Sequence, residues 1–526
     1  MTEILHYVWL GVLSVFTGPA LFDIAGIGVP TALVMLFFGL LTGIAVGATP
    51  GLAGPMAMAV SLPILLSVFG VSADALLPVF AFLIGIMKGA TVGGAVPAIL
   101  FNTPGTPDAF MTTLDGYPMT LRGTPKRALK IAHFSSVSGD TISDIVLFVC
   151  APFLAVMVES VLDLPEKTAL IILSLSFIAS VMGKSVAKGL ISVSLGLIAA
   201  FVATGNTFHP RMTMGIDALS EGFPLIAAVL GVLILGEVYM AIFSMWSGLR
   251  DTSADIREAE HEPDGLRPGD LRRTLPFIGR SSMIGCVIGA LPGVGSTLAA
   301  TLGYTIGKRV HDARKAPDAK SFGDGIPEGI AATEAANSAV SGANLIPVLS
   351  LGIPGNAAAV FLILAADSIG GFNPGPSVFT FTAPQINPEL VIAFGLFTLM
   401  ALGNLLNWTI GGVFMRGMGV MARVPNRILL PVVLLVTLTA IYVQETSLTA
   451  LWIAILFGFL GFFLRVLEIS ILPFVIAFIL AGPLENTARQ AFGASGGDPF
   501  FLLRSPVAVG LLIATAVVIV FLMRRK

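Results

Sequence analysis

Four Pro-Gly pairs are the residues of this chain whose type and spacing best indicate chemistry. Pro50-Gly51 and Pro104-Gly105 lie in the first half, and Pro292-Gly293 and Pro354-Gly355 lie at matching distances in the second half. Proline ends a helix because it lacks a backbone N–H, and glycine permits the turn that follows. Each pair therefore predicts a broken helix. The free N–H groups of the next helix start favour an anion such as a carboxylate, and unwound carbonyls favour a sodium ion.

Polar residues beside these breaks form the predicted substrate site. Thr106, Ser296, Thr297 and Asn356 follow three of the breaks, and Thr, Ser and Asn are favoured caps of helix N-termini. An isolated Pro-Gly pair is more often a kink or a close helix contact, but four pairs at duplicated positions favour a functional cavity. The residues expected to bind substrate are Thr49, Pro50, Gly51, Asn102, Thr103, Pro104, Gly105, Thr106, Pro292, Gly293, Gly295, Ser296, Thr297, Asn337, Pro354, Gly355 and Asn356.

Charged and amide side chains inside apolar segments are the candidates for ion coupling. A charge at the bilayer centre costs roughly 2.5–3.5 kcal/mol on insertion scales, so each should face a cavity or a partner. Asp140 and Asp144 lie one helical turn apart. They could hold a cation or share a proton, or they could pair with Lys88 and only fasten helices. Glu334 precedes Asn337 in a segment of small residues, where a functional role is favoured. The ion-coupling candidates are Glu334, Asn344, Asp140, Asp144 and Lys88.

The elements that position these residues must be membrane helices. Of the 526 residues, 55% are hydrophobic and 11% are charged, whereas a soluble domain has about 25% charged residues. A soluble protein is therefore excluded, and a net charge of −2 gives no indication of nucleic-acid binding. The predicted fold class is an all-α polytopic membrane protein. The clearest apolar stretches that reach the roughly 20 residues needed to cross a bilayer are 24–48, 76–100, 223–246, 391–414 and 506–523.

The distribution of lysine and arginine predicts topology. Both are absent from residues 1–87 and 322–415, and the positive-inside rule places the basic segments, including the C-terminus, in the cytoplasm. The first Pro-Gly segment lacks basic flanks, but its counterpart in the second half has them on both sides. We therefore predict two inverted structural repeats with broken or re-entrant helices that carry the Pro-Gly motifs. The predicted boundaries are 1–249 for the first membrane repeat, 250–275 for a cytoplasmic linker and 276–526 for the second membrane repeat.

Enzyme motifs fail on inspection. Gly183-Lys184-Ser185 is similar to the end of a P-loop, but Ile178 stands where the first glycine is required. The sequence has no His-Glu-x-x-His motif and no Cys/His cluster, so we expect no enzyme activity, no cofactor and no metal site. The alternatives to a carrier are a membrane enzyme acting on a lipid-linked substrate, a passive channel and a membrane assembly scaffold.

Three longer segments resemble a known family. Residues 98–120, 289–310 and 326–359 are similar to the signatures of the large membrane subunit of the tripartite tricarboxylate transporters. The resemblance implies a secondary carrier in a bacterial inner membrane that takes up organic di- or tricarboxylates by symport with sodium or protons. It also implies two partners, a small membrane subunit and a periplasmic substrate-binding protein. Two oppositely oriented hairpins would suit elevator-like alternating access.

The chain departs from that family's pattern near the predicted site. The first loop reads Pro50-Gly51-Leu52-Ala53, where the family usually has a second glycine in place of the alanine. Asp140 and Asp144 stand where the family normally has glycines and apolar residues, and Lys88 is unusual. We therefore expect that substrate and coupling ion can differ from the tricarboxylate norm. The family's loops and its Glu-x-x-Asn feature carry over to residues 47–51, 102–106, 292–297 and 352–356, and to Glu334 and Asn337.

Overall fold

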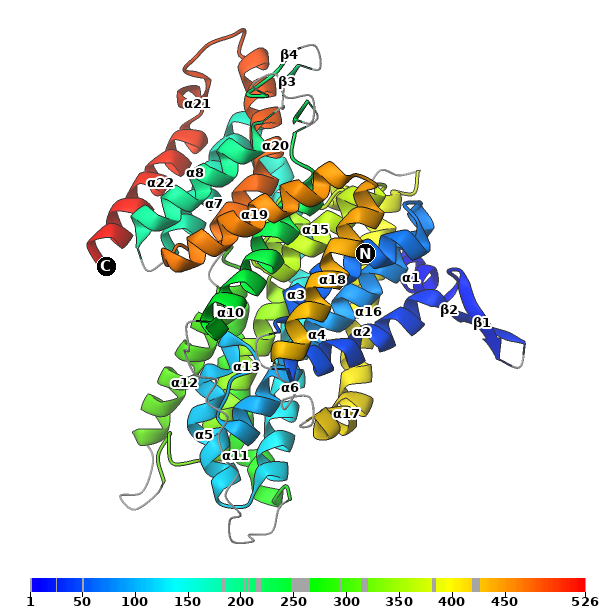
Figure 1. Ribbon diagram of the computed structural model, residues 1–526, viewed down its shortest axis with the longest axis vertical. Coiled ribbons are helices and arrows are strands. Elements are labelled where there is room, and N and C mark those ends of the chain that lie inside the picture. Colours follow the sequence, from blue (N-terminus) through cyan, green and yellow to red (C-terminus); the bar gives the residue numbers. More distant parts are fainter. Residues whose placement is uncertain are drawn as a thin grey trace. The chain divides into compact units, whose positions relative to one another are not determined.

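The computed structural model of the chain is almost entirely helical (Figure 1). Its described residues are 2–24, 26–49, 52–181, 185–202, 205–206, 209–213, 219–220, 222–246, 265–292, 295–313, 320–380, 385–418 and 426–525. Strands within these ranges form two short antiparallel hairpins, in which β1 (Ala20–Ile24) pairs with β2 (Ile27–Pro30) and β3 (Gly205–Asn206) pairs with β4 (His209–Pro210). The all-α fold class predicted from the sequence is therefore confirmed.

Contacts between elements divide the chain into two compact units, and each unit combines helices from both halves of the sequence. The first unit contains α1 to α5, the greater part of α6, and α11 to α17. The second contains α7 to α10, the greater part of α18, and α19 to α22. This division does not test the predicted boundaries of the two repeats, because those boundaries come from a duplication in the sequence. They stay a prediction.

The first unit holds every described residue of the predicted site except Pro292. After the β1–β2 hairpin, its helices pack mostly with neighbours from their own half of the chain, as α2 does with α4 and α11 with α13, and α1 and α4 also pack against α16 of the other half. Its helices are α1 (Thr2–Phe16), α2 (Thr31–Gly47), α3 (Gly54–Phe69), η1 (Ala73–Ala75), α4 (Leu76–Phe101), η2 (Pro107–Ala109), α5 (Phe110–Leu121), α6 (Pro125–Val161), α11 (Pro268–Gly289), α12 (Ser296–Asp312), α13 (Pro327–Ala343), α14 (Leu345–Leu351), α15 (Ala357–Ile369), η5 (Pro376–Phe379), α16 (Pro388–Leu406), the π-helical η6 (Asn407–Gly411) and α17 (Gly412–Gly417).

The second unit is a helical bundle, and its described residues include no predicted site residue other than Pro292. Within it α7 packs against α8, α20 and α22, and α19 packs against α9 and α10. Its helices are α7 (Leu164–Val181), α8 (Val186–Ala200), α9 (Leu225–Leu230), the π-helical η4 (Gly231–Leu235), α10 (Gly236–Trp246), α18 (Asn426–Glu445), α19 (Leu448–Val466), α20 (Leu472–Ala494), α21 (Phe501–Arg504) and α22 (Pro506–Arg525).

Glycines allow two helix pairs of the first unit to approach closely. In the first half, α2 packs along α4, and a Cβ atom on Gly43 would lie 2.5 Å from the carbonyl oxygen of Ile86. In the second half, α11 packs along α13, and a Cβ atom on Gly285 would lie 2.4 Å from the carbonyl oxygen of Ala336. Such distances exclude any side chain, as in other small-residue contacts between membrane helices. Gly43 and Gly285, which precede the first break of each half, therefore allow close packing of the two helices.

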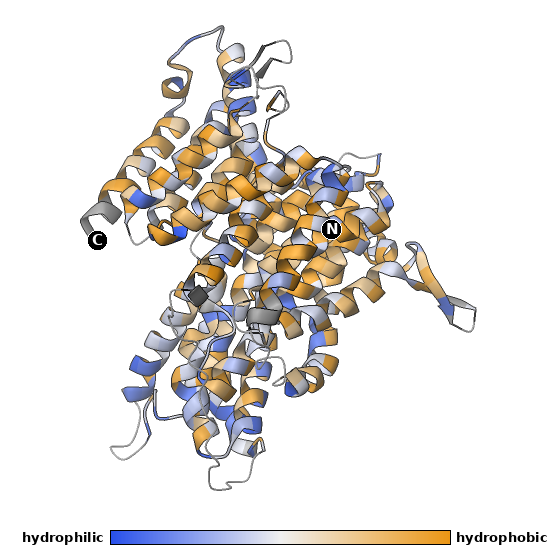
Figure 2. Cartoon of the chain, viewed as in Figure 1, coloured by the Kyte–Doolittle hydropathy of each residue, from blue (hydrophilic) through white to orange (hydrophobic). Residues whose placement is uncertain are grey.

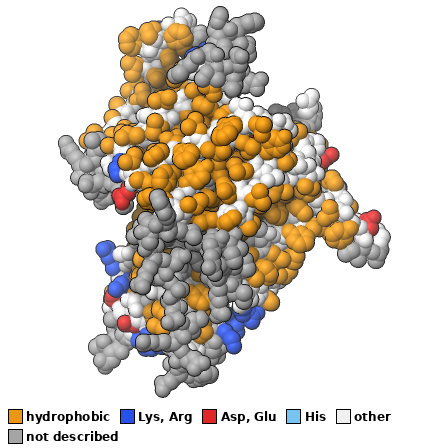
Figure 3. Space-filling view, in the orientation of Figure 1, with side chains coloured by type: hydrophobic (Ala, Val, Ile, Leu, Met, Phe, Trp, Pro, Cys, Tyr) orange, Lys and Arg blue, Asp and Glu red, His pale blue; other side chains and the backbone are white. Residues whose placement is uncertain are grey.

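Five segments of the described residues are long and apolar enough to cross a membrane. Three of them match the predicted stretches 76–100, 223–246 and 391–414. Hydrophobic residues dominate most helices (Figure 2), and hydrophobic side chains cover most of the described surface on the visible face (Figure 3). The five segments are Ala73–Phe101, Pro125–Ser160, Leu225–Ser244, Pro388–Gly417 and Leu448–Val466.

The predicted span 24–48 is wrong as a single helix. Its first residues belong to the β1–β2 hairpin, and α2 begins only at Thr31 and has 17 residues. Both the N–H and the hydroxyl of Thr31 donate to the carbonyl of Pro19, at 2.8 and 2.7 Å. The hairpin therefore turns the chain before the helix starts, and apolar composition alone could not separate strand from helix. The predicted stretch 506–523 lies within α22.

Candidate functional site

The first polar loop, Asn102–Thr106, follows the end of α4. Asn102 ends this helix in the left-handed conformation, with a φ of 55°. The N–H of Thr103 then donates to the carbonyl of Pro97 at 3.2 Å. Because Pro97 lacks an N–H, the carbonyl of Gly93 one turn earlier also loses its helical partner. The loop therefore begins where α4 has already freed backbone groups.

The second polar loop, residues 352–356, ends α14 in the same way. Gly352 is left-handed, with a φ of 70°, and the N–H of Ile353 donates to the carbonyl of Pro347 at 3.2 Å. Each of these three residues lies 250 positions after its counterpart in the first loop. The duplicated Pro-Gly sequence thus has a duplicated backbone geometry.

Each loop folds back against its own helix at equivalent positions. The N–H of Gly105 donates to the carbonyl of Gly94 at 3.3 Å, and a Cβ atom on Gly105 would lie 2.2 Å from the carbonyl oxygen of Gly47 on α2. In the second half, a Cβ atom on Gly355 would lie 3.0 Å from Oδ1 of Asn344. Thus the first loop is pinned by backbone atoms, whereas the second faces an amide side chain.

The start of α12 lies beside the segment that follows the first loop. Gly295, with a φ of 79°, occupies the N-cap position, and Ser296 is the first helical residue. The predicted cap role of Ser296 and Thr297 is therefore wrong, because the chain enters the helix through the glycine. The hydroxyl of Thr297 instead donates to the carboxylate of Asp108. This bond joins the start of α12 to η2 of the other half.

The remaining predicted caps have different outcomes. Oδ1 of Asn356 accepts the N–H of Ala359 at 2.9 Å, so Asn356 caps α15 as predicted. Thr106 does not cap a helix with its side chain, because α5 begins later, after η2. Its carbonyl accepts the N–H of Ala109 at 3.0 Å, and its side chain is buried against Gly94.

Every residue of α13 is buried, although the helix contains carboxylate, amide and hydroxyl groups. Glu334 has no exposed surface. One of its carboxylate oxygens accepts from the hydroxyl of Thr112 on α5, and the other accepts from the hydroxyl of Ser136 on α6 at 2.7 Å. No lysine or arginine of the described residues pairs with Glu334, and these two hydroxyl partners are neutral.

Other polar atoms of the same helix have no partner in the described part of the chain. These are Oδ1 of Asn337, the hydroxyl of Ser338, and both side-chain polar atoms of Asn344, which ends α13. Buried polar groups are nearly always hydrogen-bonded, so each of these atoms is available to a ligand, an ion or water. Glu334 and Asn344 are about 15 Å apart along the helix. A path of polar groups therefore runs along α13 inside the first unit.

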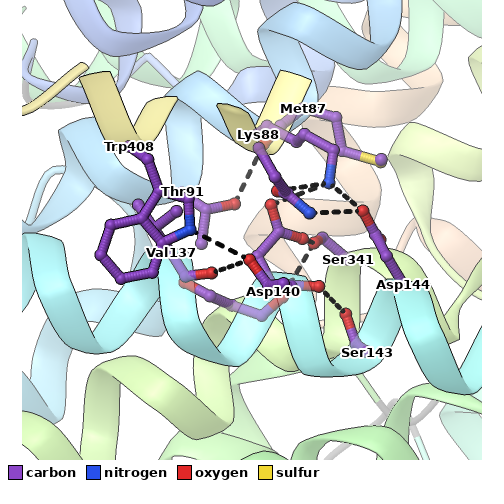
Figure 4. A network of polar contacts seen from close by, with 12 residues as sticks. Met87, Lys88, Thr91, Val137, Asp140, Ser143, Asp144, Ser341 and Trp408 are labelled. Atoms are coloured by element: carbon purple, nitrogen blue, oxygen red, sulfur yellow. Dashed lines mark hydrogen bonds and ion pairs between the residues drawn. The ribbon is translucent and has the colours of Figure 1, made fainter. Parts of the chain in front are cut away.

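Lys88 of α4 is also fully buried, and it lies between two carboxylates of α6 (Figure 4). Its Nζ is 2.9 Å from Oδ2 of Asp140, 2.8 Å from Oδ2 of Asp144 and 3.0 Å from Oδ1 of Asn404 on α16. Asn404 Nδ2 donates to Asp144 at 2.7 Å, and the hydroxyl of Ser341 on α13 donates to Oδ1 of Asp140. The ion pair that the sequence left open is therefore formed, and it connects four helices.

Three residues of the predicted substrate site, Pro50, Gly51 and Gly293, lie outside the described residues. The residue before the first of them, Thr49, is buried, and its hydroxyl donates to the carbonyl of Ala45 at 2.9 Å. Pro292 lies in the turn after α11.

Asp115 in the segment after the first loop fastens the chain before α13. Its carboxylate accepts the N–H groups of Gly323, Gly325 and Ile326 and the hydroxyl of Tyr304, at distances of 2.9 to 3.1 Å. This arrangement fixes the start of α13 with a carboxylate from the other half.

A second carboxylate fastens the start of α11. Nε of Arg127 donates to Asp270 at 2.8 Å, and the N–H of Arg267 donates to it at 2.9 Å. Burial alone would raise the pKa of Asp270, but these bonds hold that pKa below its ordinary value. Asp270 is therefore bound as a carboxylate.

Sequence reasoning missed several partners of the candidate residues. Thr112 and Ser136 gave no signal, because hydroxyl residues are common in membrane helices. Asn404 did carry one, since it is an amide within the apolar stretch 391–414. Asp108 could be recognised only from its contact with Thr297. Among the described residues, no group of three or more His, Cys, Asp or Glu side chains could hold a metal ion.

Comparison with known proteins agrees with the fold and with these motifs. Residues 33–476 match the model of the tripartite tricarboxylate transporter TctA family. This chain belongs to the TctA family. The match covers both Pro-Gly loops, α13 and the Lys88 cluster, so the candidate site lies within the part that the family shares.

Two relatives of this TctA chain come from Agrobacterium vitis. An uncharacterized 52.8 kDa protein in the TAR-I ttuC' 3' region is 30% identical over 488 residues, which are 92% of this chain and 91% of that protein. An uncharacterized protein in the TAR-II ttuC' 3' region is 30% identical over 232 residues, which are 43% of this chain and 89% of that protein. No solved structure matches the chain. The TctA match makes this chain a multi-pass membrane protein of a tripartite transporter family.

Proposed function

We propose that this chain is the carrier subunit of a secondary active transporter that takes up an organic di- or tricarboxylate. A sodium or proton gradient would drive the uptake. The observation that carries the proposal is the buried polar path along α13, with unpartnered amide and hydroxyl atoms that end at Asn344 beside the loop 352–356. A passive scaffold has no need of such a path, because buried polar atoms without partners destabilise a fold.

Carboxylate groups of the substrate would bind at the helix starts beside the breaks. A helix N-terminus offers free N–H groups and about half a positive charge. The hydroxyl of Thr297 already donates to the carboxylate of Asp108, so this helix start has the chemistry that a substrate carboxylate needs. Ser296 and Asn337 would add polar contacts, and Asn356 would keep the start of α15 ordered by capping it.

The coupling ion would bind near α13. Glu334 is a buried carboxylate that accepts hydrogen bonds from two hydroxyls, and such a group favours a sodium ion or a proton. The free Oδ1 of Asn337, about one turn along the helix from Glu334, could complete an oxygen-lined cation site, and Asn344 is a separate candidate at the end of the helix. Asp140, Asp144 and Lys88 form the second candidate for coupling.

Alternating access would come from movement of the helices that carry the loops relative to the remaining helices. The duplicated loop geometry supports two structural repeats, and the distribution of basic residues supports their inverted orientation. An elevator-like motion fits two hairpins that enter from opposite sides. Cysteine pairs between moving and static helices that cross-link equally with and without substrate would refute it.

The TctA family name implies partners for this chain. We propose that it works in a bacterial inner membrane with its C-terminus in the cytoplasm, as symporter subunit beside a small membrane subunit. A periplasmic binding protein would deliver the substrate.

Uptake into proteoliposomes tests this function. The vesicles would contain this chain and its small membrane partner, and labelled citrate and succinate would be offered under sodium or proton gradients, with and without the binding protein. We expect saturable, gradient-driven uptake. Uptake that neither saturates nor follows a gradient would indicate a passive channel. No uptake from a well-folded preparation would favour an assembly scaffold or another substrate class.

A further inference from the structure

The cluster around Lys88 has one negative charge more than its cation can balance. Lys88 contributes one positive charge, and Asp140 and Asp144 contribute two negative charges when both are ionised. The side chain of Lys88 has no exposed surface, and those of Asp140 and Asp144 are only 5% and 3% exposed. An uncompensated charge at such a site is strongly unfavourable, so the cluster calls for one further cation or one proton.

The unsatisfied atom of the cluster is Oδ1 of Asp144. It is buried and has no hydrogen-bond partner among the described residues. Oδ1 of Asp140, by contrast, accepts from the hydroxyl of Ser341. Oδ2 of both aspartates is taken by the Lys88 ammonium. The remaining cation must therefore bind at Asp144.

The space between the two carboxylates is already filled. Three oxygens surround the Lys88 ammonium at 2.8 to 3.0 Å, where a metal cation would otherwise sit. Gly403 packs against the aliphatic stem of Lys88, since a Cβ atom there would lie 3.0 Å from its Cδ. The ammonium is thus a fixed internal cation, and a sodium ion would have to displace it. A proton needs no such space.

The helices around the cluster supply few other titratable groups. On α6 itself His133 and Cys150 lie further along the helix, and on α13 Glu334 lies about two turns from Ser341. On α11 the thiol of Cys286 lies within electrostatic reach of Asp144. The facing part of α16 offers the neutral Asn404, and α2, which packs on α4, has no charged residue. No second lysine or arginine of the described residues compensates the charge.

We propose that Asp144 binds and releases the coupling proton beside the fixed cation Lys88, so that this chain is driven by protons and not by sodium. This inference rests on the proposed carrier function. One proton from the outer solution adds to the carboxylate of Asp144 and makes a neutral carboxylic acid. The Lys88–Asp140 ion pair that remains is balanced. Loss of the same proton to the inner solution restores the carboxylate and the net negative charge.

The cluster is also placed to act on both loops. Lys88 lies on α4, which ends in the loop at Asn102, and Ser341 lies on α13, which leads through α14 to the loop at Gly352. Protonation of Asp144 weakens its attraction to Lys88 and therefore the tie between α4 and α6. The protonation state thus changes contacts of the helices that carry the substrate loops.

The test uses counterflow to separate transport from coupling. Proteoliposomes preloaded with unlabelled citrate exchange it for labelled citrate without any gradient, which establishes the carrier function by itself. The same vesicles then receive either a pH gradient or a sodium gradient, with the membrane potential clamped. A gradient of one pH unit supports up to about tenfold accumulation for each coupled proton. We expect accumulation with the pH gradient, no accumulation with the sodium gradient, and acidification of the lumen on citrate addition.

The variant Asp144→Asn should accumulate citrate no more with the pH gradient than without it, and it should not acidify the lumen when citrate is added. Glu159→Gln is the matched control, because Glu159 lies on the same helix and forms an exposed ion pair with Lys167 at 3.0 Å. It should behave as wild type. Sodium-driven accumulation by the wild type, or proton-driven accumulation by Asp144→Asn, would overturn the proposal. The wild-type comparison decides even if the variant does not fold. Absence of wild-type citrate counterflow would refute citrate transport, the function on which this inference rests.

Discussion

Replacement of Gly105 by alanine tests whether the first loop must lie against α2 for transport. The added Cβ atom would lie 2.2 Å from the carbonyl oxygen of Gly47, whereas an ordinary C···O contact is about 3.3 Å. The loop must therefore move by about 1 Å, because the obstacle is backbone. Overpacking of this kind costs about 1–3 kcal/mol of stability, and a 1 Å displacement of a binding group can lower a rate by about 100-fold.

The assay is citrate counterflow per molecule of folded protein, with abundance measured by size-exclusion chromatography in detergent. We expect Gly105→Ala to lower counterflow by about 100-fold while much of the protein stays folded. Gly355→Ala should lose only a few-fold, because its Cβ atom would meet Oδ1 of Asn344 at 3.0 Å and that side chain can move. Gly279→Ala is the control, since its Cβ atom on α11 would meet no atom within 4 Å.

Unchanged counterflow per molecule in Gly105→Ala would refute the argument that the position of this loop sets transport. An equal loss of folded protein and of counterflow would instead assign the glycine to packing alone. The order of the three variants is itself a test, because it follows from the three distances and from no assumption about the substrate.

Three further predictions concern single groups. Asn356→Ala removes the cap of α15, which costs about 1 kcal/mol of stability. We expect it to raise the half-saturation concentration of counterflow. Asn356→Ser keeps a capping side chain and should leave that concentration unchanged. Glu334→Gln removes a buried carboxylate that accepts from two hydroxyls. We expect the melting temperature in detergent to stay the same or rise, while uptake falls at least about tenfold. A lower melting temperature would assign Glu334 to packing. Because the pKa of Asp270 is held below its ordinary value of 3.8, its bond to Arg127 stabilises the fold above that pH and is lost as pH falls through the lowered pKa. Thermal unfolding should therefore show an acid-sensitive step that Asp270→Asn lacks, and identical pH profiles would contradict this.

The sequence was informative about features that depend on local chemistry. A Pro-Gly pair breaks a helix wherever it occurs, so the positions of both loops and the cap at Asn356 could be predicted. The burial of Glu334 and Asn337 followed from their apolar surroundings. The predicted side-chain caps of α12 and α5 were wrong. Gly295 precedes α12 and η2 precedes α5, and residue type alone does not reveal this backbone geometry.

Features that depend on distant pairs could not be predicted. The partners of Glu334 are more than 190 residues away along the chain, and the amide that completes the Lys88 cluster is 316 residues away. The sequence left the pairing of Lys88 with Asp140 and Asp144 open, and only the fold decided it. The span 24–48 failed for a related reason, since pairing of β2 with β1 overrides a composition that suits a helix.

The complete burial of α13 has a consequence for how the protein is made. This helix has 17 residues, two of them glutamates, and is not among the described segments apolar enough to cross a membrane. Because a glutamate is costly to place in lipid, we expect this helix to enter the membrane only against other helices. These helices must already be in the membrane when α13 packs against them. The hydroxyls that bind the Glu334 carboxylate lie on α5 and α6, in the half that is synthesised earlier. The order of synthesis thus matters, because the first half provides the polar side chains against which α13 of the second half packs.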